Sequence, residues 1–564
     1  HGSNAFADKY RRLYRALDLA EPHLREDGQA LVFVSSRQDT VQAAKKARDE
    51  ITDRDVPMAS RGDYDFHTEA AELSNDTLRQ SVLDGVGFHH AGLSKGDRDR
   101  VEAWFKRGKI GILFSTSTLA WGVNLPARCV VIRDTKYHDP LEGETDISPL
   151  DVLQMLGRAG RPGYDDVGYG WVVCDRGDAD TYRELLREGK PIESRLAAEL
   201  PAHLNAEVAM GTIRGLDDVM AWLETTFYYV RARSEPDAYG FDGIRDRVRD
   251  TLESLVEEGF VAADDDLRVE PTTLGRLASK YYLRLETARR FRELAGRERL
   301  TADGILATVA GAAAFDSVSA RAAEADAVDR ILEGHDTALE DGHRKVFAIL
   351  LASMADTVPS ELRSDAWVIR QNALRLLAAL SEFLDELAGP RAANLACRVE
   401  ARVEHGVSRE AVALTAVDGV GSRRADRLAD AGITSPAAIR AAGTAGLSNV
   451  GMGEGVAERI VEAAGAVPQI RVDWGTFPER VAVGENELCE VAVTAVGGGA
   501  RVGIRVTVND VEMTATTTYL DGETTVPVGV FGPPDADALT FVVEVVFPDL
   551  PVMPVRAERQ VVVE

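Results

Sequence analysis

Short apolar runs alternate with amphipathic stretches along residues 30–175, and the two patterns predict different elements. The apolar runs cover residues 30–34, 86–89, 110–115, 129–133 and 169–174. Stretches with helical periodicity, such as residues 40–51 and 95–109, lie between them. Continuous apolar strands that are each followed by a helix are typical of a parallel sheet covered on both faces. We therefore predict an α/β lobe over residues 5–190, with functional side chains where its strands end.

The pattern becomes mainly helical after residue 190. Ile244, Val248 and Leu252 recur at intervals of four, which places them on one face of a helix, and Gly259 ends that helix. Residues 260–261, 264–266 and 267–269 then have the pattern of a strand, a turn and a strand. Helices followed by a short hairpin predict a winged helix over residues 191–290. A generic helical linker is the alternative.

Three further segments differ in composition. Residues 291–408 are helical in pattern and rich in Ala, Leu and Arg, whereas residues 409–466 hold two similar Gly-x-Gly units. Residues 467–564 carry Val/Thr runs of period two, broken by Gly, Pro and an Asn-Asp pair. Several such runs at about ten-residue spacing predict a small β-sandwich. We therefore expect a multidomain chain, with helical domains and a β-sandwich after the α/β lobe.

The chain is strongly acidic. It has 92 acidic and 65 basic residues, a formal charge of −27, and only ten of the basic residues are Lys. This composition resembles that of proteins from salt-loving archaea; a GC-rich genome would explain the Arg excess but not the charge. At ~1 M salt the Debye length is ~3 Å, so distant carboxylates would scarcely repel a phosphate. The acidity therefore does not exclude nucleic acid as a partner.

Other features exclude several classes of protein. Four scattered cysteines form no C-x-x-C pair, which argues against a disulfide framework and against a zinc site. No apolar run reaches the ~20 residues of a membrane span, and no signal peptide opens the chain. We expect a cytoplasmic protein with no membrane partner and no metal ligands in this chain.

The sharpest segment for chemistry is residues 148–162. Ser148 can cap a helix, and Gln154, Arg158 and Arg161 follow at spacings that would place all three on one face near the helix end. Two guanidinium groups side by side suit a phosphate whose charge grows in a transition state. The alternative is a surface Arg pair in an Arg-rich protein.

Hydroxyl side chains gather at the end of another predicted strand. Residues 115–118 read Ser-Thr-Ser-Thr and directly follow the apolar run 110–114. Hydroxyls at a strand end, followed by a helical turn, make an edge that can bind phosphate. In isolation, such a cluster could equally be an ordinary helix cap.

Together these segments resemble a known family. Residues 33–37, 89–93, 115–127 and 154–162 are similar to motifs IV, IVa, V and VI in the second RecA-like lobe of superfamily-two helicases. The similar branch contains the archaeal repair helicase of stalled forks and the spliceosomal RNA unwindase. Residues 271–282 resemble that branch's winged-helix signature. The resemblance implies a helical ratchet at 291–408, a helix–hairpin–helix at 409–466 and an immunoglobulin-like β-sandwich at 467–564.

The resemblance also assigns roles to single residues. It implies that Arg158 and Arg161 are arginine fingers, with Gln154, Gly122 and Asn124 near ATP. Contacts to the nucleic-acid backbone are implied for Ser35, Arg37, His90, Thr116 and Thr118. Residues 135–146 correspond to the family's strand-separating hairpin, although an ordinary surface loop is the alternative.

Further contacts to nucleic acid are predicted downstream. Trp367 and Arg370 are candidates for the ratchet helix that stacks on and holds a single strand, but an aromatic residue is as often core. Gly419 and Gly421 would let backbone N–H groups face a phosphate, unless they only form a tight turn. The segment 467–564 carries six Arg against fifteen acidic residues, which favours a protein partner there.

Two motifs of the first helicase lobe do not occur in the sequence. It contains neither G-x-x-x-x-G-K-[ST] nor D-E-x-H, which supply the phosphate-binding Lys and the Mg²⁺ carboxylate. Residues 1–3 read like the remnant of an expression tag. We therefore expect the carboxy-terminal part of an ATP- and Mg²⁺-dependent 3′–5′ helicase, inactive without its first lobe. It would act on single-stranded or forked nucleic acid, with DNA favoured over RNA. The alternative is a non-catalytic nucleic-acid scaffold.

Overall fold

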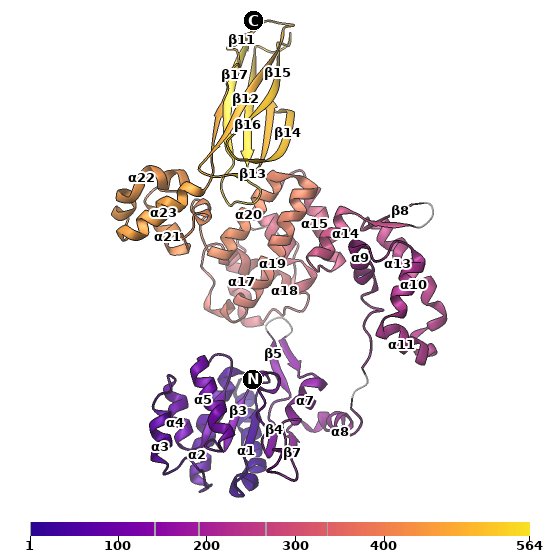
Figure 1. Ribbon diagram of the computed structural model, residues 1–564, viewed down its shortest axis with the longest axis vertical. Coiled ribbons are helices and arrows are strands. Elements are labelled where there is room, and N and C mark those ends of the chain that lie inside the picture. Colours follow the sequence, from indigo (N-terminus) through magenta and orange to yellow (C-terminus); the bar gives the residue numbers. More distant parts are fainter. Residues whose placement is uncertain (1, 140–142, 190–191, 265–267, 336) are drawn as a thin grey trace. The chain divides into compact units, whose positions relative to one another are not determined.

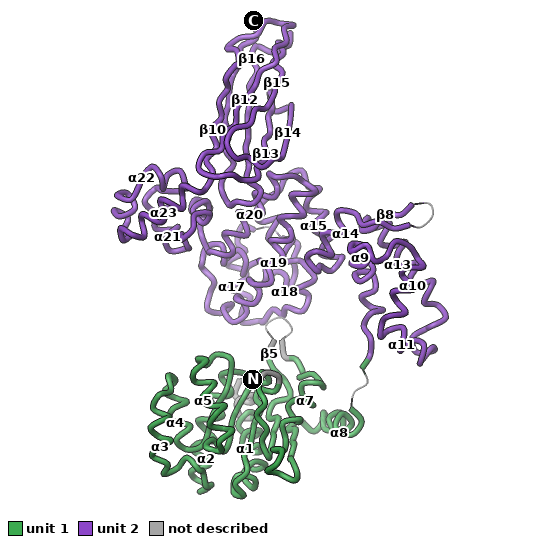
Figure 2. Tube along the Cα trace, viewed as in Figure 1, with its two compact units in different colours: residues 1–192 green, residues 193–564 purple. Residues whose placement is uncertain are grey.

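The computed structural model describes residues 2–139, 143–189, 192–264, 268–335 and 337–564 (Figure 1). It divides into two compact units, residues 1–192 and residues 193–564, shown in green and purple in Figure 2. Unit 1 is an α/β lobe. Unit 2 contains helical domains, a two-stranded sheet and two larger packed sheets.

Unit 1 is built on a five-stranded sheet of order β2-β3-β1-β4-β7, in which every pairing is parallel. The strands are β1 (Ala30–Phe33), β2 (Val86–His89), β3 (Ile112–Ser115), β4 (Cys129–Ile132) and β7 (Tyr169–Val172). The first four strands are buried at every position, as continuous apolar runs require of a sheet covered on both faces. The predicted parallel sheet is confirmed.

Helices connect these strands. They are α1 (Gly2–Arg25), α2 (Arg37–Asp53), α3 (Tyr64–Ala70), α4 (Asp76–Leu83), α5 (Lys95–Lys106), α6 (Thr118–Gly122), α7 (Pro149–Leu156) and α8 (Ala179–Glu188), with the short 3₁₀ helix η1 (Arg176–Asp178). The hydroxyls of Ser36, Ser94 and Ser148 accept the backbone N–H three residues on, which explains where α2, α5 and α7 begin. An antiparallel hairpin, β5 (Lys136–Asp139) and β6 (Gly143–Asp146), precedes α7. Residues 140–142 of the predicted hairpin segment 135–146 lie outside the described residues.

Unit 2 begins with helices and a two-stranded sheet. The elements are α9 (Leu200–Met210), α10 (Leu216–Glu224), α11 (Phe227–Ser234), α12 (Pro236–Tyr239), η2 (Phe241–Gly243), α13 (Ile244–Glu257), β8 (Val261–Ala263), β9 (Val269–Pro271) and α14 (Thr273–Lys280). Ile244, Val248 and Leu252 are buried on one face of α13, and Gly259 has a φ of 78° after it. The hairpin pairs antiparallel, as a winged helix requires. Of its predicted turn at residues 264–266, residues 265 and 266 fall outside the described residues.

The middle of unit 2 is a helical domain. It comprises α15 (Leu285–Ala295), α16 (Ala302–Ala310), η3 (Ala313–Phe315), η4 (Ala322–Glu324), α17 (Ala325–Ile331), α18 (Asp341–Ser353), η5 (Ser360–Leu362), α19 (Arg363–Ala388) and α20 (Pro390–His405). Most of α18 is buried, so the other helices pack around it. Gly389, with a φ of 89°, turns the chain from α19 directly into α20, and these two helices pack along each other.

The rest of unit 2 consists of one 3₁₀ helix, three α-helices and two sheets. The helical elements are η6 (Val412–Ala416), α21 (Ser422–Asp430), α22 (Pro436–Asn449) and α23 (Glu454–Ala466). The strands are β10 (Gln469–Asp473), β11 (Arg480–Val481), β12 (Asn486–Val496), β13 (Ala500–Val508), β14 (Val511–Leu520), β15 (Glu523–Phe531), β16 (Ala538–Val546) and β17 (Val555–Val563). They form sheets of order β10-β12-β15 and β11-β17-β16-β13-β14, whose inward residues share one core. Asn509 and Asp510 both have positive φ and form the two-residue turn between β13 and β14.

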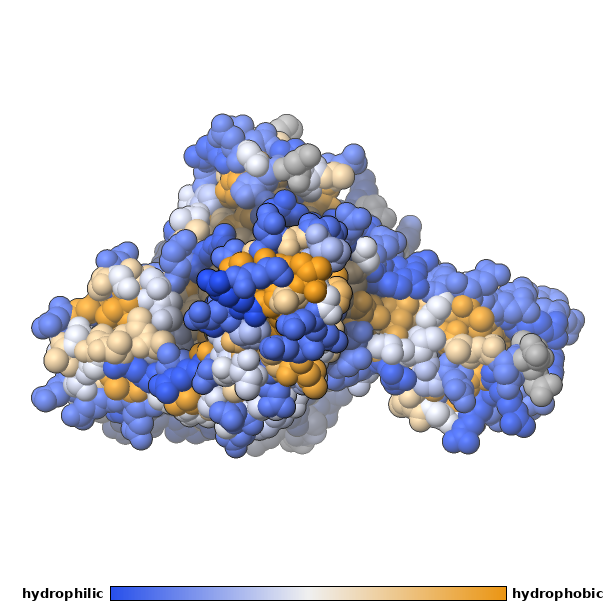
Figure 3. Space-filling view, turned by 90° about the horizontal axis from the view of Figure 1, so that it is seen from above, coloured by the Kyte–Doolittle hydropathy of each residue, from blue (hydrophilic) through white to orange (hydrophobic). Residues whose placement is uncertain are grey.

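The face of the molecule seen in Figure 3 is mostly hydrophilic, with smaller hydrophobic areas between the charged residues. Charged residues make up 28% of the chain, and acidic ones prevail. In the part of the chain that the structure describes, no helix is both long enough and apolar enough to span a membrane.

Candidate nucleotide and nucleic-acid sites

Three neighbouring strands of unit 1 end level with one another. In the sheet register, Ser115 at the end of β3 pairs with Phe33 of β1 on one side and with His89 of β2 on the other. The chain therefore leaves all three strands at the same carboxyl edge. The five residues predicted to contact a nucleic-acid backbone follow the ends of these three strands: Ser35, Arg37, His90, Thr116 and Thr118.

The hydroxyl cluster at this edge is not used as a helix cap. Ser117 occupies the N-cap position of α6 but makes no side-chain capping hydrogen bond. The Oγ1 atoms of Thr116 and Thr118 lie 2.9 Å apart, and Thr118 is exposed. Ser115, by contrast, is buried and donates to the carbonyl of His89 at 3.2 Å. Thr118 is therefore exposed at this edge and Thr116 is partly exposed and bonded to it, while the Ser115 hydroxyl bonds to the neighbouring strand.

Ser35 and Arg37 differ in how much of their bonding capacity is free. The Ser35 N–H donates to Asp134 Oδ2 at 3.0 Å, and its hydroxyl donates to Asp39 Oδ2 at 2.9 Å. Arg37 is exposed at the first turn of α2 and has no ion pair in the described part of the chain. Arg37 is therefore the cation at this edge that is available to a phosphate.

A buried ion pair beneath the edge was missed by the sequence reasoning. Arg133 and Asp134 directly follow β4, and their side chains are only 3% and 6% exposed. Arg133 Nε donates to Asp134 Oδ1 at 3.0 Å, and Asp134 in turn accepts from Ser35. The available signal was their position: charged residues that directly follow an apolar strand lie at the functional edge of a parallel sheet.

His90 is largely buried at the same edge. Its Nδ1 accepts the Gly92 N–H at 3.1 Å, and its ring is parallel to that of Phe88. Burial lowers the pKa of His90, and the nearby Arg37 guanidinium lowers it further. A neutral imidazole whose Nδ1 is an acceptor carries its proton on Nε2. His90 can thus donate one hydrogen bond but adds no positive charge.

The segment that carries Arg158 and Arg161 is not helical. α7 ends at Leu156 with Gly157 as its C-cap, so only Gln154 projects from the helix. The prediction that all three side chains share one helical face is therefore wrong for the two arginines. The physical reason is a competing strand-like pairing. Ala159 forms a parallel bridge with Ala127, with hydrogen bonds from Ala127 N to Arg158 O at 2.9 Å and from Gly160 N to Ala127 O at 2.7 Å.

This bridge places Arg158 against the segment after β3. Its Nη1 donates to Asn124 Oδ1 at 3.2 Å, and its Nη2 donates to the carbonyl of Ala120. Its Nε is buried and has no partner in the described structure. The structure therefore brings together Arg158 and Asn124, and Gly122 is the last residue of the same helix, α6. Gln154 is exposed and makes no hydrogen bond to either arginine among the described contacts.

Arg161 is held by a carboxylate that the sequence reasoning missed. Its Nε donates to Asp165 Oδ2 at 2.7 Å, and its Nη2 donates to Asp165 Oδ1 at 2.9 Å. The Arg161 backbone N–H also donates to Asp165, while Nη1 reaches Gln29 Oε1 at 3.3 Å. These bonds hold the pKa of Asp165 below its usual range. The acid–base spacing of four residues was the only signal in the sequence.

Trp367 lies on the surface of unit 2. Its side chain on α19 is 65% exposed, whereas Ile369 on the same helix is fully buried. Arg370 is half-buried, and its Nε has no partner in the described structure. A Trp in this position is open to stacking by a base.

A buried cluster fixes the start of α19. Lys345 Nζ, only 1% exposed, lies 2.6 Å from Asp365 Oδ2 and 2.9 Å from Glu324 Oε2. Asp365 is two residues before Trp367, so this cluster sets where that side chain leaves the helix. Sequence reasoning had no signal for it, because the three residues are far apart along the chain.

The two Gly-x-Gly units precede two helices in the same way. Gly419 and Gly451 have φ values of 80° and 83°, and Gly421 and Gly453 are the N-caps of α21 and α23. Neither cap residue has a side chain to satisfy the first N–H groups of its helix. Both helix starts can therefore offer N–H groups to a phosphate, which is the geometry that the prediction needs.

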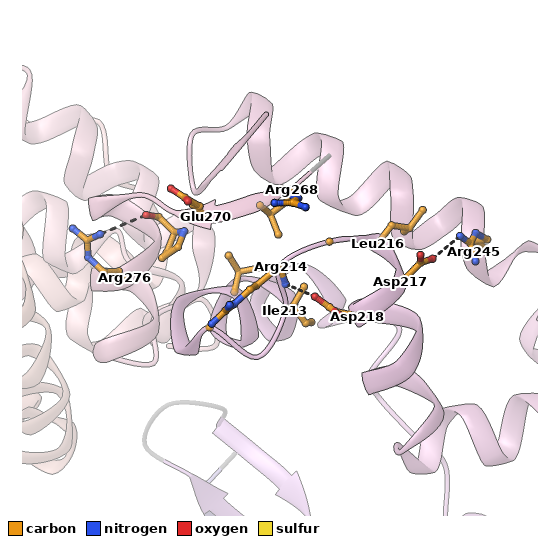
Figure 4. A pocket seen from close by; sticks show the side chains of 14 residues that line it. Ile213, Arg214, Leu216, Asp217, Asp218, Arg245, Arg268, Glu270 and Arg276 are labelled. Carbon is orange, nitrogen blue, oxygen red and sulfur yellow. Dashed lines mark hydrogen bonds and ion pairs between the residues drawn. The ribbon is translucent and has the colours of Figure 1, made fainter. Parts of the chain in front are cut away.

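A cavity of about 990 Å³ lies in the winged-helix region, between the start of α10, α13, β9 and α14 (Figure 4). Four arginines and three acidic residues are among its lining residues: Arg214, Arg245, Arg268, Arg276, Asp217, Asp218 and Glu270. Arg245 is paired with Asp217 at 2.9 Å. Because the cavity presents both signs of charge, we assign it no phosphate.

Three family models match the chain in the order of its domains. The helicase conserved C-terminal domain matches residues 65–163, and a winged helix-turn-helix domain matches residues 193–267. The Sec63 Brl domain matches residues 271–550. The chain thus combines a helicase C-terminal lobe with a winged helix and a Sec63 domain.

The chain is also similar in sequence to proteins that carry two different names. The chain is 34% identical over 381 residues to the U5 small nuclear ribonucleoprotein 200 kDa helicase of Drosophila melanogaster. The aligned region covers 63% of the chain and 18% of that protein. It is 31% identical over 382 residues to activating signal cointegrator 1 complex subunit 3 of Dictyostelium discoideum, covering 64% and 17%. The human protein of the latter name is 33% identical over 380 residues, covering 63% and 17%.

The chain spans less than a fifth of the length of these relatives. The comparisons confirm the helicase resemblance at the level of its domains. The archaeal origin, the fork-repair branch and the preference for DNA stay predictions.

Proposed function

We propose that this chain is part of an ATP-dependent nucleic-acid helicase and supplies its second RecA-like lobe together with domains that hold the strand. The observation that carries this proposal is the bridge between Ala127 and Ala159. It joins two segments that are separate in the sequence and places Arg158 on Asn124. The match to a helicase C-terminal domain supports the same assignment.

The residues around the bridge fit a nucleotide phosphate. Arg158 has a buried Nε without a partner in the described structure, whereas the Arg161 guanidinium is bonded to Asp165 and Gln29. Bound ATP would supply the phosphoryl group whose hydrolysis drives the cycle. Arg158 and Arg161 would stabilise its growing negative charge, with Gln154, Gly122 and Asn124 nearby. Among the described residues no group of three His, Cys, Asp or Glu could hold Mg²⁺, so we derive no step through that ion.

The carboxyl edge of the sheet would hold the strand backbone. Arg37 offers a cation, Thr116 and Thr118 offer hydroxyls, and neutral His90 offers one N–H. None of these contacts reads a base, so binding would not depend on the base sequence of the strand. Trp367 and Arg370 on α19 and the helix starts at Gly421 and Gly453 would hold the strand farther along, with 3′–5′ movement as the proposed direction.

The test of this proposal joins the chain to a first RecA-like lobe that carries a Walker loop. We expect ATPase activity stimulated by single-stranded nucleic acid, and unwinding of a duplex with a 3′ overhang but not a 5′ overhang. The chain alone should hydrolyse ATP no faster than background, because it contains no Walker loop. Turnover by the chain alone that Arg158→Ala abolishes would contradict the assignment.

A non-catalytic scaffold is the second candidate. The mixed charges of unit 2 and its exposed Trp367 would also serve a protein that only binds nucleic acid. Binding without stimulated ATPase in the joined protein would favour it. DNA and RNA strands of one sequence should be compared directly, since one relative is named for a small nuclear ribonucleoprotein. A protein partner at residues 467–564 remains a proposal based on their acidic charge.

A further inference from the structure

The end of α14 carries a tyrosine in a conformation that favours glycine. Tyr282 has a φ of 51°, in the left-handed region. Its N–H donates to the carbonyl of Ser279 at 3.1 Å, and the Leu283 N–H donates to that of Ala278 at 2.9 Å. These two bonds close the helix, and Leu283 is buried beside them. Glycine is the usual residue at the left-handed position of such an ending, because a Cβ atom there is strained.

The side chain of Tyr282 does not compensate for this strain within the fold. It is 92% exposed, so its ring buries almost no surface. Among the described residues, it makes no hydrogen bond and no ring contact. By contrast, the adjacent Tyr281 packs against α19 and donates its hydroxyl to Glu382. Folding therefore accounts for Tyr281 but not for Tyr282, and an unfavourable backbone conformation of this kind points to a function.

Contacts at the end of α14 place Tyr282 beside the helix that carries Trp367. Arg375 Nη1 donates to the carbonyl of Tyr281 at 3.4 Å, and Lys280 Nζ is 2.6 Å from Glu382. Trp367 and Arg375 are exposed on α19 and are eight residues apart, with exposed Gln371 midway between them. The interval of four places the three on one side of the helix, and eight residues span about 12 Å along its axis.

We propose that Tyr282 is a second base-stacking residue, so that a single strand lying along α19 contacts both Trp367 and Tyr282. This inference rests on the proposed function, since it adds to the strand-holding role of Trp367. The ligand class is single-stranded nucleic acid of any sequence, because every base has a face that can stack on an aromatic ring. Arg375, between the two rings, would contact a phosphate or a base face.

The test uses the full chain and the variant Tyr282→Gly. Glycine removes the ring and relieves the backbone strain, so the melting temperature should stay unchanged or rise. Affinity for a 12-nucleotide single strand should fall about fivefold or more, the lower range for loss of one stacked base. Tyr282→Phe keeps the ring and should bind like the wild type. Tyr519→Ala is the matched control, because Tyr519 is also exposed, at 69%, but lies on β14.

Fluorescence of a strand that contains 2-aminopurine provides a readout that a purely structural role would not change. Stacking quenches this base, so the wild type and Tyr282→Phe should quench it and Tyr282→Gly should quench it less. Equal affinity and equal quenching by the wild type and Tyr282→Gly would overturn the inference. A melting temperature lowered by Tyr282→Gly would also overturn it, because the ring would then serve the fold. If the wild type binds no single strand, the proposed function fails as well. If Trp367→Ala weakens binding and Tyr282→Gly does not, only the further inference fails.

Discussion

Ala127 and Ala159 form a parallel β-bridge that fastens the chain entering β4 to the segment that follows α7. The bridge has room because the residue that lies against it, Gly168, has no side chain. A Cβ atom at Gly168 would be 2.4 Å from the carbonyl carbon of Ala159 and 2.5 Å from Gly160 N. Both neighbours are backbone atoms, which cannot turn aside as a flexible side chain can.

The first prediction follows from this close approach. Gly168→Ala should lower the free energy of unfolding of unit 1 by about 1–3 kcal/mol, the usual cost of overpacking. It should also reduce ATPase activity once a first lobe is present, because Arg158 would shift from Asn124. Thermal denaturation measures the first effect. Gly177→Ala is the control, since a Cβ there would meet nothing within 4 Å. Equal losses in both variants would contradict the argument.

The second prediction concerns Arg161 and the carboxylate that holds it. In a protein joined to a first lobe, Arg161→Ala should lower kcat by ~10³-fold or more, the range that arginine fingers supply. Asp165→Asn keeps the shape but weakens the bonds to Nε and Nη2, so we expect a smaller loss of kcat. Arg183→Ala is the control, because among the described residues Arg183 forms an ion pair only with exposed Asp180. A loss below tenfold for Arg161→Ala would remove this residue from the site.

The third prediction concerns pH and Glu400. Burial raises the pKa of Glu400 to about 7, and the nearby Glu404 carboxylate adds to the shift. The folded state therefore holds this proton more tightly than the unfolded state, whose ordinary value is 4.5. Binding of this proton stabilises the folded state fully below pH 4.5, and the stabilisation is lost as pH rises toward 7.

Glu400→Gln removes this dependence. The variant should raise the melting temperature at pH 8 more than at pH 5, since only at pH 8 does the wild type bury a charged carboxylate. Differential scanning calorimetry at the two pH values is the measurement. Glu386→Gln, at an exposed position on α19, should change the melting temperature little at either pH. A gain for Glu400→Gln that is the same at both pH values would show that charge is not the cause.

The fourth prediction concerns salt. A protein that neutralises Z phosphates loses affinity for single strands with a slope of about −0.7Z in log salt. With a charge of −27, this chain should depend on stacking and on short hydrogen bonds instead. Binding should persist above ~1 M KCl, where screening is nearly complete, with a log–log slope shallower than about −3.

Trp367→Ala should then weaken binding more at high salt than Arg471→Ala, which removes a surface charge from β10. Fluorescence anisotropy from about 0.2 to 3 M KCl covers both parts, at ionic strengths where surface charge is progressively screened. A steep slope, with binding lost by about 0.5 M, would show that a basic groove dominates.

Much of the fold could be predicted because its signals are local. Continuous apolar runs predicted the parallel sheet, and the Asn-Asp pair marked a break in the Val/Thr runs where β13 turns into β14, since both signals depend on neighbouring residues. The serine caps of α2, α5 and α7 are local in the same sense. The motif segments could also be found, because their residues are contiguous.

The arrangement of the candidate site needed the tertiary structure. By itself, the sequence determined which elements form and which motif residues they carry. The structure decided that Arg158 and Arg161 leave the helix, because Ala127, more than thirty residues earlier, offers a competing backbone partner. It also decided that Tyr282 is strained and exposed while Tyr281 is anchored by Glu382, about a hundred residues later. Contacts between distant segments leave no periodic trace in the sequence, and only folding brings those segments together.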